Sequence, residues 1–397
     1  MALIRGLSDG WLRLVGKAGL ACLCLVSLSA HAVDWRVTLI EQANSPQLDK
    51  TRLERAYLGH PGGSAADGVS VAVDEAQFEL EAVKARIVLK TESVAAMADA
   101  RVAAQTAEKN GAAALVVNLP ADWVAAVASA VKLPVLNVGA SDDRLRERGC
   151  ASNLYHLVPS ERMRADAVGQ ALLARKWTQV LLLTGASAED VQRTAVALAS
   201  IKRYGLKLVA NKPYKLSADP RERSLANLTL LTANMAYDAV WVIDSDGEFA
   251  RSLPYNTAQA RPVVGDAGLV ALAWSAQFER FGGPQVSRRF VKAAKRPMTG
   301  HDWASWMAGK ALVALAVAQT KLDPVSVGKA LVQANLDGSK GVAMQFRPWD
   351  RQLRQPILLS DGQGVLATMP LEGVMHPRNT LDTLGADEPE KLCKSTS

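Results

Sequence analysis

The sequence predicts an α/β fold with two doubly wound parallel-sheet lobes and a ligand cleft between them. Short apolar runs, such as residues 114–117 and 238–243, alternate with longer segments of helical character. These runs are apolar throughout, which is typical of parallel strands that helices cover on both faces. The alternation occurs once in the first part of the chain and starts again near residue 158. The 397 residues suffice for two lobes that each bury a core.

The first half shows strand and helix signals in turn. Ser64 and Asp67 form an S-x-x-D pattern, which predicts a capping box and a helix that ends near Glu75. Ser93 is expected to cap the next helix, with Gly111 as its left-handed stop. The other elements expected here are strands over 35–40, 85–89, 114–117 and 134–138, and a helix over 122–131.

The second half repeats this pattern and then changes character. Its expected strands span 179–184, 206–210, 238–243, 261–265 and 269–274, and its helices 161–176, 188–204 and 221–235. Three further helices are expected over 286–294, 302–319 and 324–334, followed by strands within 343–370. The tail after Thr383 is expected to be loosely ordered.

The first 32 residues have the three parts of a secretion signal. Basic residues precede an apolar run over 18–28, and small residues surround the sequence Ala30-His31-Ala32. The run is shorter than the ~20 residues that a membrane-spanning helix needs. We therefore expect cleavage after Ala32 and a periplasmic location. Lipidation at Cys22 is the alternative, although residues 19–21 match a lipobox poorly.

Cleavage leaves a mildly basic chain in an oxidising compartment. The signal carries three basic residues and one acidic residue, so the formal charge falls from +7 to +5. No stretch combines clustered Lys and Arg with aromatic residues, which argues against a nucleic-acid partner. Cys150 and Cys393 remain, and we predict a disulfide between them; two unpaired thiols are the alternative.

The boundaries expected from this pattern leave two discontinuous lobes. The chain is thus divided into a signal over 1–32, lobe 1 over 33–157 plus 277–337, lobe 2 over 158–276 plus 338–380, and a tail over 381–397.

Candidate ligand-binding residues follow the expected strand ends, where ligands bind in such sheets. In the first half they are Asn118, Ser141 and Asp142, for which helix capping is the alternative role. In the second half they are Asp244 and Asp266. The sequence Asp244-Ser245-Asp246-Gly247 lacks the further acidic positions of an EF-hand, so a turn explains it better than a metal site.

Other polar and aromatic residues have competing roles. His60 precedes two glycines and a capped helix, a pattern that fits either anion binding or a tight turn. Trp303 and Trp306 have the spacing of a helix face and are expected in the core, with a cleft wall for an apolar or aromatic ligand as the alternative. The mature chain has no G-x-S-x-G, H-E-x-x-H or C-x-x-C motif, and no G-x-G-x-x-G follows its first strand. We therefore expect no enzyme activity, no cofactor and no metal.

The strand at 134–138 and its small-residue loop Gly139-Ala140-Ser141 resemble the type I periplasmic solute-binding proteins of the leucine/isoleucine/valine-binding-like family. The resemblance covers the whole mature chain. It implies a bilobed receptor that closes like a Venus flytrap on a small ligand. One departure concerns the loop over 118–122, which has no Ser or Thr, whereas amino-acid binders of the family grip the α-carboxylate with hydroxyl-rich loops.

Four short motifs are similar to a narrower subgroup. The subgroup comprises the substrate-binding proteins that accompany pyrroloquinoline-quinone (PQQ)-dependent alcohol oxidation systems. The motifs are Leu58-Gly59-His60-Pro61-Gly62-Gly63, Phe281-Gly282-Gly283-Pro284-Gln285, Pro297-Met298-Thr299 and Gln352-Leu353-Arg354-Gln355-Pro356.

This resemblance implies a monomeric periplasmic component of an ABC-type uptake system, with a small-molecule ligand and a membrane permease as partners. The alternative is a periplasmic sensor or accessory protein that works with an alcohol dehydrogenase and takes no part in transport.

Overall fold

The computed structural model describes residues 32–45, 62–373 and 376–393. The predicted signal up to His31, the alternative lipidation site Cys22, and His60 lie outside these ranges.

Sheet A contains the first five strands, all parallel, in the order β2-β1-β3-β4-β5. They are β1 (Val33–Gln42), β2 (Ala85–Val94), β3 (Ala114–Asn118), β4 (Val135–Asn137) and β5 (Leu154–His156). The sequence analysis predicted the first four and missed the three-residue strand β5. The strand order reverses between β1 and β3, which is where ligands bind in open α/β sheets.

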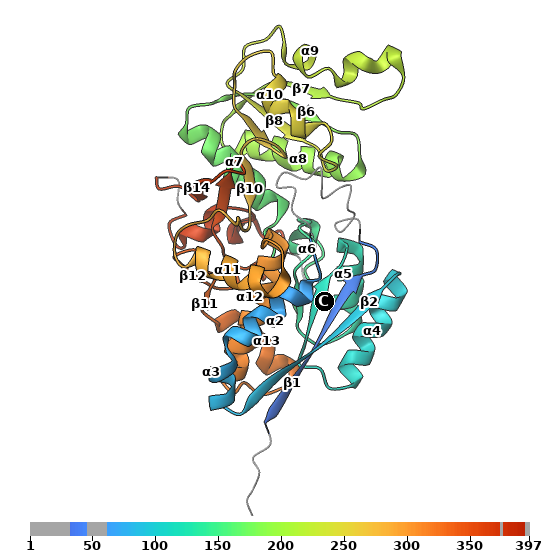
Figure 1. Ribbon diagram of the computed structural model, residues 1–397, viewed down its shortest axis with the longest axis vertical. Coiled ribbons are helices and arrows are strands. Elements are labelled where there is room, and N and C mark those ends of the chain that lie inside the picture. Colours follow the sequence, from blue (N-terminus) through green and yellow to red (C-terminus); the bar gives the residue numbers. More distant parts are fainter. Residues whose placement is uncertain (1–31, 46–61, 374–375, 394–397) are drawn as a thin grey trace, which may run out of the picture. The chain divides into compact units, whose positions relative to one another are not determined.

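Helices cover both faces of sheet A. One core contains Trp35, Trp303 and Trp306, and the other lies under α4 and α5. The helices that follow the strands of sheet A are α2 (Ala65–Glu75), α3 (Gln77–Ala82), α4 (Met97–Lys109), α5 (Ala121–Ala130) and the short α6 (Arg144–Glu147). Helix α4 lies against β1 and β2 (Figure 1). The burial of Trp303 and Trp306 confirms their expected core role.

Two predicted helix starts differ from the structure. Ser64 caps α2 by accepting from Ala66, but Asp67 binds Arg296 instead of closing the capping box. A buried arginine is a stronger partner for this carboxylate than a backbone amide. Ser93 lies inside β2, and α4 begins at Met97 without a side-chain cap. Gly111 adopts the expected left-handed conformation, with φ 74°.

Sheet B repeats the design with β6 (Gln179–Thr184), β7 (Lys207–Pro213), β8 (Ala239–Ile243) and β9 (Val263–Gly265) in the parallel order β7-β6-β8-β9. The sheets A and B form the two predicted lobes. Helices α7 (Glu161–Ala174) and α8 (Ala188–Arg203) pack together beside sheet B.

The prediction of a single helix over 221–235 was wrong. This segment forms a 3₁₀ helix, η2 (Pro220–Ala226), and a separate short helix, α9 (Leu228–Thr232). Asn227 divides them because its extended backbone starts a new helix, in which its side chain accepts from Leu230. The short elements η3 (Ala250–Ser252) and α10 (Leu253–Asn256) follow β8.

The last part of the chain adds helices and small antiparallel sheets. The helices are α11 (Gly283–Ala294), α12 (Gly300–Val317) and α13 (Pro324–Gln333). Strands β10 (Val270–Leu272), β13 (Ile357–Ser360) and β14 (Val365–Met369) form one antiparallel sheet, and β11 (Leu336–Asp337) pairs with β12 (Ala343–Met344). The 3₁₀ helices η4 (Thr380–Thr383) and η5 (Glu388–Glu390) end the described chain.

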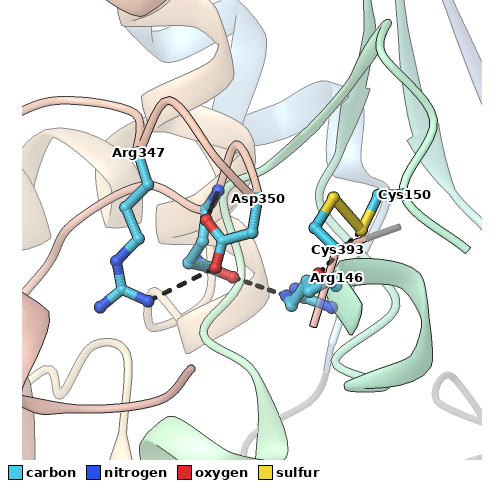
Figure 2. Close-up of a disulfide and its surroundings, with 6 residues drawn as sticks. Arg146, Cys150, Arg347, Asp350 and Cys393 are labelled. Carbon is cyan, nitrogen blue, oxygen red and sulfur yellow. Dashed lines mark hydrogen bonds and ion pairs between the residues drawn. A yellow bond between two sulfur atoms is a disulfide. The ribbon is translucent and has the colours of Figure 1, made fainter. Parts of the chain in front are cut away.

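The segment after Thr383 is not loosely ordered throughout, as the sequence analysis expected. Leu384 is fully buried, and Gly385 bonds to both Asp166 and Arg203. A disulfide joins Cys150 to Cys393, with the Cα atoms 5.6 Å apart. Figure 2 shows this disulfide beside Arg146, near the ion pair of Arg347 with Asp350.

Arg146 joins three segments that are distant in sequence. Its guanidinium donates to the carbonyl oxygens of Asp142 and Val158, at 2.8 and 3.0 Å, and to Gln352 Oε1 at 2.6 Å. Gln352 donates in turn to the carbonyl oxygens of His156 and Val158. The loop after β4, the segment after β5 and the returning chain before β13 are therefore held together.

We predict that Arg146→Met lowers the free energy of unfolding by about 2–4 kcal/mol, because several buried acceptors lose their donor. The urea midpoint of the purified protein measures this. Arg148→Met, a change of an exposed arginine in the same segment, is the control. Equal midpoints for the two variants would contradict the assigned role of Arg146.

Candidate ligand-binding site

The predicted site residues lie at the carboxyl ends of both sheets. Asn118 ends β3, and Ser141 and Asp142 follow β4. Asp244 directly follows β8, and Asp266 directly follows β9. The position of each residue relative to its strand therefore agrees with the sequence analysis, and their side-chain contacts divide them into two groups.

Asn118 and Ser141 are half-buried on the side of sheet A. A Cβ atom on Gly139 would come within 2.6 Å of Asn118 Oδ1, so glycine is needed for the close approach of these two loops. The carbonyl oxygen of Ser141 accepts from the Glu161 amide at 3.0 Å, and its hydroxyl bonds to the Glu161 carboxylate. Ser141 thus contacts the start of α7.

The carboxylates of the three predicted aspartates already have partners within the protein. Asp142 lies 3.3 Å from Arg144 Nε. Asp244 is buried and accepts from the amide of Ala250 at 2.8 Å. Asp266 accepts from the Asp244 amide at 2.7 Å. These bonds shape the loops after β4, β8 and β9.

The amino end of α2, which follows His60, also has an anionic partner. Glu41 accepts from the Ala65 amide at 3.1 Å and from the Ser64 hydroxyl at 2.8 Å. A side-chain carboxylate therefore occupies the position at this helix terminus that an anionic ligand would take.

An ion-pair cluster between α7, α8 and β9 was not predicted from the sequence. Arg193 Nη2 lies 2.5 Å from Asp266 Oδ1, and Arg193 Nε lies 3.2 Å from Glu161 Oε2. Burial alone would lower the pKa of Arg193, but Asp266 and Glu161 outweigh burial and raise it. Burial would raise the pKa of Glu161, but Arg193 and Arg164 lower it. Arg193 and Glu161 are therefore charged at neutral pH. Burial raises the pKa of Asp266, against the lowering effect of Arg193.

Arg164 lies one turn along α7 from Glu161 and has an unused donor. Its Nε is buried and has no hydrogen-bond partner among the described residues. Arg164 lines a pocket together with Glu161, Arg193 and Asp266. The apolar residues that line the same pocket are Ala165, Val168, Val196, Ala197, Trp241, Ile243, Val270 and Ala271.

His301, near the start of α12, contributes from the side of sheet A. Its Nδ1 lies 3.2 Å from the Val138 carbonyl oxygen, so Nδ1 carries the proton and Nε2 is an acceptor. Burial lowers the pKa of His301, and the positive charge of Arg164 lowers it further. His301 is therefore neutral at pH 7.

The sequence offered little signal for these residues. Arg164, Arg193 and Glu161 lie in helices rich in charged residues, where the sequence cannot distinguish a solvated face from a site wall. Within the described ranges, no group of three or more His, Cys, Asp and Glu side chains is arranged to hold a metal ion. None of the helices in those ranges has the length and apolarity to cross a membrane.

Comparison with known proteins relates this architecture to ABC transporter components. No family model matches the sequence, and no curated protein matches it. One similar solved structure is a solute-binding protein from Rhodopseudomonas palustris BisB5 in complex with 3,4-dihydroxybenzoic acid. The two sequences are 14% identical, the match covers 85% of this chain and 97% of that protein, and the TM-score is 0.63.

Two other solved structures are similar to a comparable degree. A substrate-binding protein from Desulfitobacterium hafniense in complex with Leu is 13% identical, with 85% and 100% coverage and a TM-score of 0.65. A solute-binding protein from R. palustris in complex with benzoate is 15% identical, with 89% and 98% coverage and a TM-score of 0.61. The chain has the fold of the type I periplasmic binding proteins.

The contacts of Asp266 lead to a stability prediction. Asp266→Ala should lower the free energy of unfolding by about 2–4 kcal/mol, because Arg193 loses a close partner and the Asp244 amide loses its acceptor. Thermal unfolding followed by circular dichroism measures the change. Glu279→Ala, at an exposed carboxylate, is the control. A melting curve like that of the control would show that Asp266 does not hold the cluster.

Asp143, beside Ser141 and Asp142, gives a pH prediction. Burial raises its pKa to about 7, from an ordinary 3.8, against the lowering effects of Ser160 and Arg146. Between these values the folded state retains a proton that the unfolded chain releases. Stability should therefore fall as pH rises from about 4 to 7, by at most about 1.4 kcal/mol per unit from this group.

Asp143→Asn should remove this component, so its stability should fall less steeply than that of the wild type. Urea midpoints at several pH values between 4.5 and 7.5 test this, with Asp99→Asn, at an exposed position, as the control. Parallel profiles for the wild type and Asp143→Asn would contradict the raised pKa.

Proposed function

We propose that this protein is the periplasmic solute-binding component of an ABC-type uptake system and that it binds a small carboxylate by closure of its two lobes. The observation that carries the proposal is the buried Nε of Arg164, which has no partner among the described residues and lies in a pocket with an apolar wall. A ligand that supplies an acceptor there would satisfy this donor. Carboxylates are the strongest such acceptors for arginine.

Hydrogen-bonding capacity, rather than net charge, argues for a carboxylate. The charges of Glu161, Asp266, Arg164 and Arg193 sum to zero. However, Glu161 and Asp266 both bond to Arg193, which leaves Arg164 Nε without an acceptor. A carboxylate would complete the set. The pocket has a volume of about 50 Å³, so it would hold the carboxylate group while the body of the ligand lies outside it.

The predicted residues take different parts in this proposal. Ser141 and Asn118 contact the ligand from the side of sheet A, and His301 Nε2 accepts a hydrogen bond from a ligand hydroxyl. Asp142, Asp244 and Asp266 act as positioning residues, because their carboxylates already bond within the protein. His60 stays a proposed anion contact outside the described residues.

The ligands of the similar structures support a carboxylate. 3,4-Dihydroxybenzoic acid, benzoate and leucine are bound by proteins described as ABC transporter components, and each of the three molecules carries a carboxylate group. Ligand binding would shift the equilibrium from open to closed lobes through contacts that only the closed form makes.

We further propose a link to PQQ-dependent alcohol oxidation, with an acid formed from an alcohol as the solute and a membrane permease as the partner of a monomeric receptor. The support is the four-motif resemblance. Where described, these motifs serve the fold: Thr299 caps α12, and Gln352 and Gln355 bond to the chain after β5. The motifs therefore indicate relationship rather than ligand contact.

The experiment is calorimetric titration of the mature protein with benzoate, hexanoate, leucine, benzyl alcohol and benzamide. We expect a carboxylate to bind and its neutral counterpart to bind at least tenfold more weakly. Arg164→Met should raise the dissociation constant at least about tenfold, since a hydrogen bond to a charged group contributes about 1.5–3 kcal/mol.

Arg251→Met, at an exposed arginine, is the matched control and should bind like the wild type. If the neutral compounds bind as tightly as the acids, Arg164 is not the ligand anchor. If no solute binds and the protein instead copurifies with a periplasmic dehydrogenase, the accessory role replaces the transport role.

A further inference from the structure

A second pocket lies at the end of sheet A where its strands begin. It is a groove of about 620 Å³ between α13 and the amino ends of β4 and β5. Pro134 and Asn153, which precede these two strands, line it. Because β4 and β5 are parallel, this edge is the reverse of the edge at which Asn118 and Ser141 lie. Its volume is within the ~300–1,000 Å³ range of small-molecule sites.

Three cationic residues, and no carboxylate of the described chain, line the groove. Lys132, Lys329 and Arg351 line it, and none of the residues that line it is Asp or Glu. The Nε of Arg351 is buried and has no hydrogen-bond partner in the described chain. Lys132 and Lys329 are exposed, so they can reorient toward a bound group.

Neighbouring contacts fix the position of Arg351. Its amide donates to the Arg347 carbonyl oxygen at 3.1 Å, and its own carbonyl oxygen accepts from His156 at 3.0 Å. Its guanidinium carbon lies 5.9 Å from the centroid of the Tyr155 ring, and the Tyr155 hydroxyl donates to Gly328 of α13 at 3.0 Å. The arginine is thus held between β5 and α13. Its side chain bonds to that of Tyr155, while its Nε has no partner among the described residues.

The rest of the lining is largely apolar. Pro134, Pro324, Val325 and Val332 form this part of the wall, and Val325 is 65% exposed. An apolar ligand body would cover this surface, while an anionic group would satisfy Arg351 and neutralise the lysines. Inorganic anions would leave the apolar wall exposed to water.

We propose that this groove is a second ligand site, which binds a small organic anion with an apolar body independently of the site at Arg164. Arg351 anchors the anionic group, Lys329 and Lys132 add long-range attraction, and the prolines and valines contact the body. The site makes no use of lobe closure, because its described lining comes from sheet A, α13 and the turn at Arg351.

The test uses 8-anilinonaphthalene-1-sulfonate, a fluorescent probe with an anionic group on an apolar body, at fixed ionic strength. We expect saturable binding that hexanoate displaces and hexanol does not. Arg351→Met should raise the dissociation constant of the probe at least tenfold. Lys329→Glu, a change at an exposed position that leaves the core intact, should raise it at least threefold.

Two controls locate the effect. Lys109→Glu, on the exposed face of α4, makes the same charge change elsewhere and should leave probe affinity unchanged. Arg251→Met, at an exposed arginine that lines neither pocket, removes a positive charge elsewhere and should also leave it unchanged. Absence of saturable binding, equal displacement by hexanol and hexanoate, or unchanged affinity in both groove variants would overturn the proposal.

Discussion

The burial of one positive charge, on Arg146, is the constraint on which the arrangement around the candidate site depends. Its side chain is 2% exposed, and burial lowers its pKa to about 10, so it stays protonated at neutral pH. An unpaired buried charge is very costly, yet no carboxylate lies within ion-pair distance among the described residues. Backbone carbonyl oxygens and Gln352 satisfy it instead, which requires three distant segments to meet at one point.

This requirement has a direct consequence for the site. Because Arg146 holds the carbonyl oxygens of Asp142 and Val158, the loop after β4 and the chain entering α7 are fixed together. Ser141 therefore meets Glu161, Glu161 meets Arg193, and Arg193 meets Asp266. A continuous path of bonds runs from the loops of sheet A to those of sheet B, and Arg164 lies beside it. A ligand at Arg164 would act on contacts that involve both sheets.

The sequence was sufficient where local chemistry determines structure. Apolar runs predicted most strands of both sheets, because a buried parallel strand requires apolar residues on both faces. Predictions failed for two different reasons. A distant partner, Arg296, takes Asp67 from its capping box, and a local cap at Asn227 interrupts the helix expected over 221–235. The predicted aspartates do follow the strands, but their carboxylates bond internally. Arg164 could not be recognised from sequence, because its importance comes from which neighbours are already bonded.

The buried cations of this protein differ in whether the protein supplies hydrogen-bond acceptors for them. This difference separates structural from ligand-binding roles. Arg146 and Lys340 both use carbonyl oxygens, and burial lowers the pKa of Lys340 well below its usual value, so neither requires an added anion. Arg164 and Arg351 each retain a buried Nε that has no partner in the described part of the chain, and each lines a pocket. Other unpartnered donors, such as Trp274 Nε1, line neither of these pockets. A buried donor without a partner lowers the stability of the protein. A ligand that reaches the donor and accepts its hydrogen bond removes this cost. The two sites therefore follow from the same physical argument, although they lie on different parts of the fold. Residues of α7, α8, β8, β9 and β10 line the pocket at Arg164, whereas the groove at Arg351 lies at the amino ends of β4 and β5.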